Sequence, residues 1–343
     1  MQLQKKKRLK KWLFFEALMQ GIFTISLDFE LHWGAFDKRS RDNMLECYRN
    51  TLATIPLMLT LFEKCNVHVT WAVVGALYLR NGEEWESMKP LALPSYSNRA
   101  YSAYDWVEKN GLPEKYKEAH FALDVIKSIS NYAGQEVGTH TYGHYYCLEE
   151  FTGKDAFNDD LVAVKRVAAK NNTAPVSLVF PRNQFDEKSL ETCAANGIKV
   201  VRSNPSNWFW KPIRDKSSTI TRKFFRTADA YLPVSDQRTS YPIQAIKLQQ
   251  NKPIQLPASR FLRPWQPGRP LMNKLKLRRV LNELSVAAAR NECYHLWWHP
   301  ENFGANPYEN MQDLTLILNE YTKCKTKKGM QSWNMSEYVQ HLA

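Results

Sequence analysis

Two histidines, His140 and His144, stand four residues apart in the run EVGTHTYGHYY, which covers residues 136–146. Residues four apart on a helical turn face the same way, so both imidazoles can reach one divalent cation. The spacing alone is a weak indication, because such pairs also occur as ordinary surface or core histidines. Cys147 is a candidate fourth ligand, although packing is the favoured interpretation for it. A metal site needs a further ligand from elsewhere in the chain.

Carboxylates and a third histidine supply the remaining groups. Asp28 and Glu30 follow the apolar run Ile22–Leu27 in the sequence ISLDFELHWG. Side chains two apart on an extended strand point the same way. One carboxylate with two histidines makes a three-ligand catalytic metal site with an open position. The other carboxylate is then available as a base, and His299, in LWWHPENFG, as an acid.

The elements that must position these residues alternate between apolar strands and amphipathic helices. The predicted strands are Ile22–Leu27, Val67–Val74, Gln135–Gly138, Pro175–Phe180, Ile198–Arg202, Cys293–Trp298 and a last one near Met330–Trp333. The predicted helices are Met44–Lys64, Lys115–Ser130, Asp155–Lys170, Glu187–Asn196, Leu271–Arg290, Tyr308–Lys323 and Ser336–Leu342. This alternation predicts a single α/β domain with parallel strands. The stretches 81–112 and 203–270 interrupt it as irregular insertions.

The polar clusters all lie at the carboxyl ends of predicted strands, where parallel α/β folds collect their functional side chains. Four motifs, ISLDFELHWG, THTYGH, LVFPRNQF and LWWHPENFG, occur in that order. Together they resemble the motifs of the polysaccharide deacetylase family, also called the NodB-homology or carbohydrate esterase family 4 group. The resemblance covers the chain from about Gly21 to its C-terminus and leaves residues 1–20 as a basic amphipathic segment. It implies a distorted (β/α)7 barrel and metal-dependent removal of an N-acetyl group from a sugar.

The resemblance also implies roles for single residues. His140 and His144 would bind the metal, most simply zinc, with cobalt, nickel or manganese as alternatives. Asp28 would be the general base. The family's usual first motif has two adjacent aspartates, the second of which binds metal. Phe29 occupies that place here. Some members have a D-x-D spacing instead, and the D-x-E of this chain resembles a longer equivalent, so Glu30 is the expected third ligand, with a site that lacks its carboxylate ligand as the alternative.

Further residues are expected around this centre. Arg182 would orient the catalytic aspartate, and His299 would protonate the leaving amine. Trp298 would wall the acetyl pocket, with plain core packing as its alternative. Candidates for substrate contacts are Asn183, Trp208 and Trp210, and Gln184, Glu301 and Asn302 are candidates for substrate or supporting hydrogen bonds, with ordinary packing or loop capping as the alternatives.

Charge and cysteine usage bear on partners and compartment. The net charge is +13, and it is concentrated: residues 1–12 hold six Lys or Arg and no acid, and residues 211–280 hold 16 against three Asp. Such localisation indicates a polyanionic partner, such as an anionic membrane surface, a phosphate-bearing lipid or an acidic glycan, and no nucleic-acid motif accompanies it. Six dispersed cysteines without a C-x-x-C pair, and a basic start without a signal-peptide pattern, indicate the cytoplasm, on or near the inner membrane face.

The sequence therefore predicts a deacetylase acting on an N-acetylated polysaccharide, oligosaccharide or lipid-linked glycan precursor. Two other functions remain open at this stage. One is a deformylase or another hydrolase of non-peptide C–N bonds. The other is a glycan- or lipid-binding protein without catalysis, built on a degenerate barrel. Neither the sugar nor the oligomeric state follows from the sequence.

Overall fold

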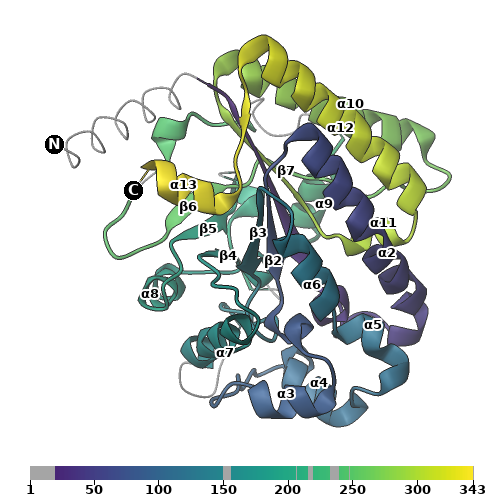
Figure 1. Ribbon diagram of the computed structural model, residues 1–343, viewed down its shortest axis with the longest axis vertical. Coiled ribbons are helices and arrows are strands. Elements are labelled where there is room, and N and C mark those ends of the chain that lie inside the picture. The colour runs from purple at the N-terminus through teal and green to yellow at the C-terminus, as the bar shows by residue number, and fades with distance from the viewer. Residues whose placement is uncertain are drawn as a thin grey trace.

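The computed structural model describes residues 20–149, 156–205, 207–214, 219–231, 239–246 and 248–342. The predicted basic segment 1–20 falls outside these ranges except for Gln20. Within them, strands form one sheet and helices surround it (Figure 1). No helix in these ranges is long and apolar enough to cross a bilayer.

The sheet is parallel throughout its ladders, in the order β6-β5-β4-β3-β2-β1-β8-β7, with β9 paired to the start of β1. The strands are β1 Ile22–Phe29, β2 Val69–Val73, β3 Gln135–Thr139, β4 Ser177–Val179, β5 Val200–Ser203, β6 Ile254–Pro257, β7 Arg260–Phe261, β8 Cys293–Trp298 and β9 Gln331–Ser332. Successive strands of a parallel sheet need crossover connections, which the helices provide.

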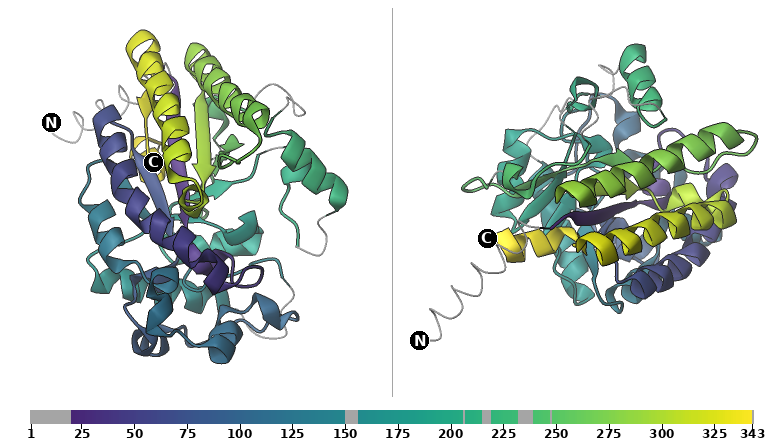
Figure 2. Two further views of the ribbon diagram at one scale, coloured as in Figure 1. Left: turned by 90° about the vertical axis from the view of Figure 1, so that its right-hand side faces the viewer. Right: turned by 90° about the horizontal axis from the view of Figure 1, so that it is seen from above.

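The helices cover the outside of the sheet (Figure 2). They are α2 Arg41–Cys65, α3 Gly82–Met88, α4 Ala103–Asn110, α5 Lys117–His120, α6 Leu123–Ser130, α7 Ala156–Lys170, α8 Glu187–Ala195, α9 Ile220–Ala228, α10 Pro270–Arg290, α11 Glu301–Gly304, α12 Pro307–Lys328 and α13 Met335–Leu342. Short 3-10 turns are η1 Leu31–Gly34, η2 Gly75–Tyr78, η3 Arg99–Tyr101, η4 Glu114–Tyr116, η5 Pro181–Asn183, η6 Trp208–Trp210 and η8 Ile243–Ala245.

One extended stretch joins the two edges of the sheet. Strand β6 pairs with β5, and β7, only two residues later, pairs with β8. Between them, the Ala258 amide donates to the Ser203 carbonyl and the Ser259 amide donates to the His295 carbonyl, each at 2.8 Å. Counting β6 and β7 as one bent strand, the chain curls the sheet into a distorted barrel with β1 to β5 and β8.

The fold class expected from the sequence is thus confirmed, but the structure contains one strand that the sequence did not predict. The long insertion around 203–270 contains the strand that joins the barrel edges, which periodicity missed because β6 and β7 are short and separated by a bend. The predicted strand near Met330–Trp333 is present as β9, but it pairs only with the first residues of β1. The predicted helix Lys115–Ser130 is divided into η4, α5 and α6.

Alternation along β1 separates the core from the barrel interior. Phe23, Ile25, Leu27 and Phe29 belong to the largest apolar cluster, against the surrounding helices. Burial of such side chains is the main driving force for the fold. The intervening residues point into the barrel, so the period of two that builds the core also aims polar side chains inward.

Candidate active site

The sheet register brings the expected site residues to one end of the barrel. Phe29 pairs with Val73, and Val73 pairs with Thr139 on the next strand. Glu30 and His140 each follow the last residue of their strand, so they leave the sheet at the same level. On the other side of β1, Leu27 pairs with Trp298, and this pairing places the following residue of the chain, His299, beside Asp28.

Glu30, His140 and His144 form a cluster whose potential ligand atoms all lie within 4.8 Å of one another. Oε2 of Glu30 is 3.2 Å from Nε2 of His140 and 3.0 Å from Nε2 of His144. Phe29 is fully buried in the apolar core on the opposite face of β1, beside Trp71. The D-x-E spacing therefore places the Glu30 carboxylate in the cluster, whereas the side chain of Phe29, the residue next to Asp28, points away from it into the core.

The outer nitrogens of both histidines have partners that leave Nε2 directed at the cluster. Nδ1 of His140 lies 2.8 Å from the Val179 carbonyl, and Nδ1 of His144 lies 3.0 Å from the Tyr146 hydroxyl. A proton on Nδ1 leaves the Nε2 lone pair free for a metal, and such partners orient the ring. Burial lowers the pKa of His144 despite the nearby Glu30 carboxylate, which favours the neutral imidazole that metals need.

The loop that carries the histidines has a strained backbone held by a buried carboxylate. Thr141 and His144 adopt φ angles of 65° and 58°, in the left-handed region that L-residues rarely occupy. Asp160 of α7 accepts hydrogen bonds from the Tyr142 and Gly143 amides at 2.7 and 3.2 Å. Strained residues of this kind persist only where the surroundings over-determine them. Asp160 supplies that constraint.

Asp28 is held by an arginine from β5. Arg202 donates from Nη1 to Oδ1 of Asp28 at 2.6 Å and from Nη2 to Oδ2 at 2.7 Å. Its guanidinium carbon also lies 4.1 Å from the Trp297 ring centroid. Burial by itself would raise the pKa of Asp28, but the Arg202 charge, with smaller contributions from His140 and His299, outweighs it and lowers the pKa. Asp28 is therefore a carboxylate at neutral pH.

His299 stands at the rim of the cluster, with its side chain 29% exposed. Its Nε2 is 3.8 Å from Oδ2 of Asp28 and 3.6 Å from Oε1 of Glu30, too far for direct hydrogen bonds. An imidazole that is accessible to solvent and lies beside two carboxylates is available to donate a proton to a group bound between them. Burial tends to raise the pKa of Glu30, but the neighbouring His299 and His144 hold it well below its usual range.

Arg182 does not contact Asp28, so the expected role of orienting that aspartate is taken by Arg202. Arg182 instead forms an ion pair with Asp37 after η1. The sequence pointed to the wrong arginine because Arg182 immediately follows a strand, whereas its backbone turns at φ 53° and leads the side chain elsewhere. Asn183 accepts a hydrogen bond from Nη2 of Arg202 at 3.1 Å, so it supports the arginine that holds Asp28.

Trp298 packs in the core and Trp297 lies beside the site. Trp298 is fully buried and stacks on Phe303 with ring centroids 5.7 Å apart, as its core alternative predicts. Alternation along β8 puts Trp297 and His299 on the other face, where Trp297 covers Arg202 and its ring centroid lies 5.8 Å from that of His299. Trp297, one residue earlier, therefore lies beside the site, and the expected pocket wall Trp298 does not.

The two tryptophans of the insertion lie on η6, against α9. Trp208 is 49% exposed and Trp210 is half-buried. The side chain of Asn204 donates to the carbonyls of both Asn183 and Trp210, at 3.1 and 2.7 Å. This double contact ties η6 to the loop that supports Arg202.

The other candidates have structural partners. Gln184 donates to Glu149, and Oε1 of Glu301 accepts from the Glu30 and Leu31 amides. The Asn302 side chain lies 3.5 Å from Nδ1 of His299. Cys147 packs against an apolar cluster and is not a member of the Glu30 group.

Arg202 and Tyr146 contact Asp28 and His144 directly, and neither was expected from the sequence. Arg202 could have been recognised as a charged residue that directly follows the apolar pair Val200 and Val201 at the end of a predicted strand. Tyr146 could not have been recognised from the sequence, because its contact with His144 depends on the left-handed turn at that histidine.

No family model and no curated protein matches the sequence. Solved structures do match, at low identity. A protein from Mycobacterium smegmatis named as a polysaccharide deacetylase has a TM-score of 0.55 at 15% identity, over 94% of this chain and 90% of that one. One from Pseudomonas aeruginosa PAO1 with the same name has a TM-score of 0.54 at 11% identity, over 93% of this chain and 90% of that one. The α-amylase AmyC from Thermotoga maritima has a TM-score of 0.53 at 10% identity, over 94% and 75%.

The chain thus has the NodB-like fold of polysaccharide deacetylases, the family whose motifs its sequence resembles. The α-amylase shares that fold, and a fold does not determine the chemistry of its site. The residues at the carboxyl ends of the strands must therefore carry the functional conclusion.

Proposed function

We propose that this protein is a metal-dependent hydrolase that removes an N-acetyl group from an amino sugar of a polysaccharide, an oligosaccharide or a lipid-linked glycan precursor. The observation that carries the proposal is the convergence of Glu30, His140 and His144 within 4.8 Å, next to Asp28 and His299. Two nitrogens and one oxygen are the donor set of many catalytic zinc sites. Zinc is therefore the proposed metal, and cobalt, nickel or manganese could occupy the same donors.

Glu30, His140 and His144 would hold the metal, which when bound supplies Lewis acidity for the acetyl carbonyl and for water. Asp28, ionised and fixed by Arg202, accepts the proton of the attacking water. His299, at the exposed rim, donates a proton to the sugar amine as the C–N bond breaks. The acetyl group leaves as acetate, and the amine stays on the sugar.

Acetate release from a panel of substrates tests the proposal. The panel contains N-acetylated sugar nucleotides, lipid-linked sugars and oligosaccharides, and N-formyl analogues, from which formate release, measured separately, would reveal a deformylase. We expect activity that a chelator abolishes and that added Zn²⁺ restores. Asp28→Asn should retain the metal and lose turnover by about 10²- to 10⁴-fold. Full activity of Asp28→Asn would refute the assignment of the base.

A second candidate function is glycan binding without catalysis. One observation favours it: both Asp28 oxygens accept hydrogen bonds from Arg202, which ties up the group proposed as base. Calorimetric binding of an N-acetylated oligosaccharide, without acetate release at any metal concentration, would establish this alternative.

We further propose that the protein works in the cytoplasm, at an anionic membrane surface. Helix α9, which lies within the basic segment 211–280, and η6, which directly precedes that segment, support this proposal. Ile220, Phe224 and Trp208 are 85%, 67% and 49% exposed, and Arg222 and Arg226 lie on the same helix. Helix α9 stands out from the barrel in both views of Figure 2. Exposed apolar side chains flanked by cations suit the headgroup region of a bilayer.

Flotation with vesicles tests this proposal. The protein should bind vesicles of phosphatidylglycerol and phosphatidylcholine at low salt and not vesicles of phosphatidylcholine alone. The double variant Ile220→Ser, Phe224→Ser should bind more weakly, whereas Leu91→Ser, at a residue 90% exposed outside this segment, should not differ from wild type. Equal binding to both vesicle types would contradict the role of anionic lipid, and no binding to either would contradict a membrane role.

A further inference from the structure

Two buried side chains, Ser26 and His295, lie beside Arg202 inside the barrel. Ser26 is on β1, two residues before Asp28 and on the same face of the strand, and His295 is on the neighbouring strand β8. Both are fully buried. Nε2 of His295 lies 2.9 Å from Oγ of Ser26, and Nη1 of Arg202 lies 3.1 Å from the same oxygen. The Ser26 hydroxyl therefore joins the histidine to the arginine that binds Asp28.

The direction of these hydrogen bonds follows from what each group can donate. A guanidinium only donates, so Oγ of Ser26 accepts from Arg202 and has its own proton left for His295. His295 is then the acceptor through Nε2, with its proton on Nδ1. Burial, and after it the Arg202 charge, lower the pKa of His295 to about 3, which favours this neutral ring.

The two terminal nitrogens of Arg202 have an acceptor for each of their four protons. Nη1 donates to Asp28 and Ser26, and Nη2 donates to Asp28 and to Oδ1 of Asn183. An arginine that had only the carboxylate as its partner could tilt together with it. Because Ser26 and Asn183 lie on either side of that carboxylate, they fix the plane and the angle of the guanidinium.

His295 is itself held where the two edges of the barrel meet. Its amide donates to Oγ of Ser259 at 3.0 Å, and its carbonyl accepts from the Ser259 amide at 2.8 Å. Ser259 lies in the bend between β6 and β7, the stretch that joins the sheet edges. The imidazole therefore extends from a fixed piece of backbone, and through Ser26 it holds one side of the arginine.

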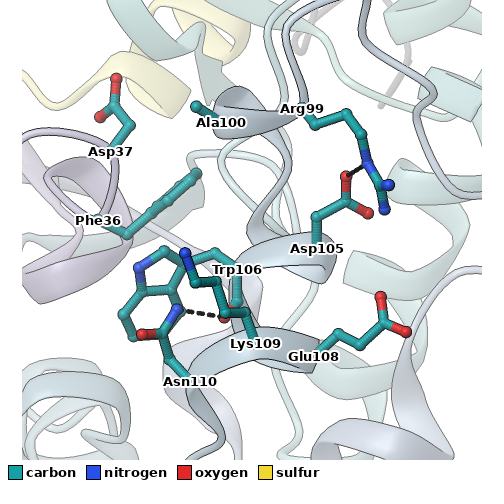
Figure 3. Close-up of a pocket in the computed structure, with 9 residues that line it drawn as sticks. All are labelled: Phe36, Asp37, Arg99, Ala100, Asp105, Trp106, Glu108, Lys109 and Asn110. Carbon is teal, nitrogen blue, oxygen red and sulfur yellow. Dashed lines mark hydrogen bonds and ion pairs between the residues drawn. The ribbon is translucent and has the colours of Figure 1, made fainter.

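Arg182 is not placed to replace Arg202 in this role. Its ion-pair partner Asp37 lines a separate pocket of about 720 Å³ (Figure 3). The guanidinium carbon of Arg182 also lies 4.1 Å from the ring centroid of Tyr146. The orientation of Asp28 therefore depends on Arg202 and on the groups that hold Arg202.

We propose that Ser26 and His295 are positioning residues that act through Arg202 and fix the direction in which the Asp28 carboxylate meets the attacking water. This inference rests on the proposed deacetylase function and adds two residues to it. A displacement of about 1 Å at a reacting group can cost about 100-fold in rate. Neither residue touches the substrate, so their loss should lower kcat and leave KM unchanged.

Ser26→Ala removes the hydroxyl that joins His295 to Arg202, and Thr24→Val is its matched control. Thr24 lies on the same face of β1 and is equally buried, and its Oγ1 is 2.8 Å from the Tyr338 hydroxyl. The control thus also loses one buried hydrogen bond, but none to Arg202. Acetate release is followed with the pentamer of N-acetylglucosamine, or with the member of the substrate panel that is hydrolysed fastest. We expect kcat of Ser26→Ala to fall by about 10- to 100-fold at an unchanged KM, and Thr24→Val to keep the wild-type kcat.

Two variants of His295 separate its hydrogen bond from its bulk. The side-chain oxygen of Gln can accept a proton near the position of Nε2, whereas Leu has no acceptor. His295→Gln should therefore have a kcat close to the wild-type value, and His295→Leu should lose kcat as Ser26→Ala does. The zinc content of all these variants should equal that of the wild type, because none of the replaced residues belongs to the metal cluster.

The kinetic outcomes separate this inference from the proposed function. Equal kcat values in Ser26→Ala and Thr24→Val, at equal zinc content, overturn the inference and leave the deacetylase function intact. A wild-type kcat in His295→Leu overturns the role of His295, and this variant also decides the matter if Ser26→Ala does not fold.

If the wild type releases acetate from no member of the panel, the deacetylase function fails, and NMR of the arginine side chains tests the alignment by itself. The Nη resonances of Arg202 are identified by their absence in Arg202→Lys. Exchange between the two Nη positions should be about tenfold faster in Ser26→Ala than in Thr24→Val, the effect of one hydrogen bond to a charged group. Equal exchange rates in the two variants overturn the alignment of Arg202 by Ser26.

Discussion

Arg202 and Asp28 form a two-point ion pair inside the barrel, at 2.6 and 2.7 Å, with side-chain exposures of 0% and 4%. Two parallel charge-assisted hydrogen bonds fix both the position and the ionisation of the carboxylate. The same contact limits the basicity of Asp28, because it stabilises the charged form. The proposed base is thus pre-organised at the expense of its proton affinity.

Replacing this arginine should change both stability and pH dependence. Arg202→Met leaves a buried carboxylate unpaired, which costs about 3–5 kcal/mol of unfolding free energy. Without the cation, the pKa of Asp28 rises, because burial remains and the largest opposing charge is gone. The base is active when ionised, so the acid limb of kcat/KM should move to higher pH. Urea unfolding and a pH–rate profile measure the two effects.

Arg182→Met is the matched control for this prediction. Its guanidinium pairs with Asp37, so the variant should keep the wild-type acid limb. An acid limb that moves equally in both variants would contradict the assignment of Arg202 as the residue that holds Asp28.

The two arginines show how far the sequence could predict the site. Residues on or directly after long apolar strands were predictable, because strand alternation and the convergence of parallel strand ends decide where Asp28, Glu30 and His299 go. Contacts made through a left-handed turn were not predictable. Arg182 and His144 have φ angles of 53° and 58°, and neither is a glycine, the residue type that normally marks such a turn in a sequence. Periodicity gives no sign of such a turn.

The fold was predictable in class and partly in its strands. Strand β1 is long, apolar and fully buried, so its pattern is clear. Strands β6 and β7 span only four and two residues and lie on either side of a bend, so no window of sequence shows a period of two. Their pairing with β5 and β8 comes from the tertiary fold and not from local propensity.

Glu30 should decide whether metal binds. Glu30→Gln keeps the size of the side chain and removes its charge, which leaves two histidines as strong ligands. The purified variant should contain much less zinc than wild type after dialysis against a trace-metal buffer. It should also lose the increase in Tm that added Zn²⁺ gives the wild type. Metal analysis by mass spectrometry, with Asp28→Asn as the metal-retaining control, measures this. Equal zinc content in Glu30→Gln and wild type would exclude Glu30 as a ligand.

The Glu30 carboxylate lies against Gly34, in space that a side chain at this position would occupy. A Cβ at Gly34 would come within 1.9 Å of Oε1 and 2.0 Å of Cδ of Glu30. The end of that side chain is flexible, so Gly34→Ala should displace the carboxylate and cost little stability. We expect about a 10- to 100-fold loss of zinc affinity, as for other changes beside metal ligands. Competition with a fluorescent chelator measures the affinity.

Gly82→Ala is the control for this prediction. Its new Cβ would meet only the Leu112 Cβ at 3.8 Å, an ordinary contact, so zinc affinity should stay at the wild-type value. A Gly34→Ala variant with unaltered affinity would show that the Glu30 carboxylate does not need its observed position.

Asp160 should make stability depend on pH. Burial raises the pKa of Asp160 to about 7 from an ordinary 3.8, although the Tyr142 and Gly143 amides oppose the shift. Between these values the folded protein holds a proton that the unfolded chain has released, so the unfolding free energy falls as pH rises from about 4 to about 7. The fall amounts to roughly 4 kcal/mol at 1.36 kcal/mol per pKa unit.

Asp160→Asn removes this dependence because an amide does not titrate in that window. The variant loses an acceptor for one backbone amide of the histidine loop, at a cost of about 1–3 kcal/mol. At pH 4.5 it should therefore be clearly less stable than wild type, and the difference should shrink or reverse by pH 7.5. Urea unfolding at several pH values measures the difference, in which the contributions of all other titrating groups cancel. A difference that stays constant with pH would mean that Asp160 is ionised throughout.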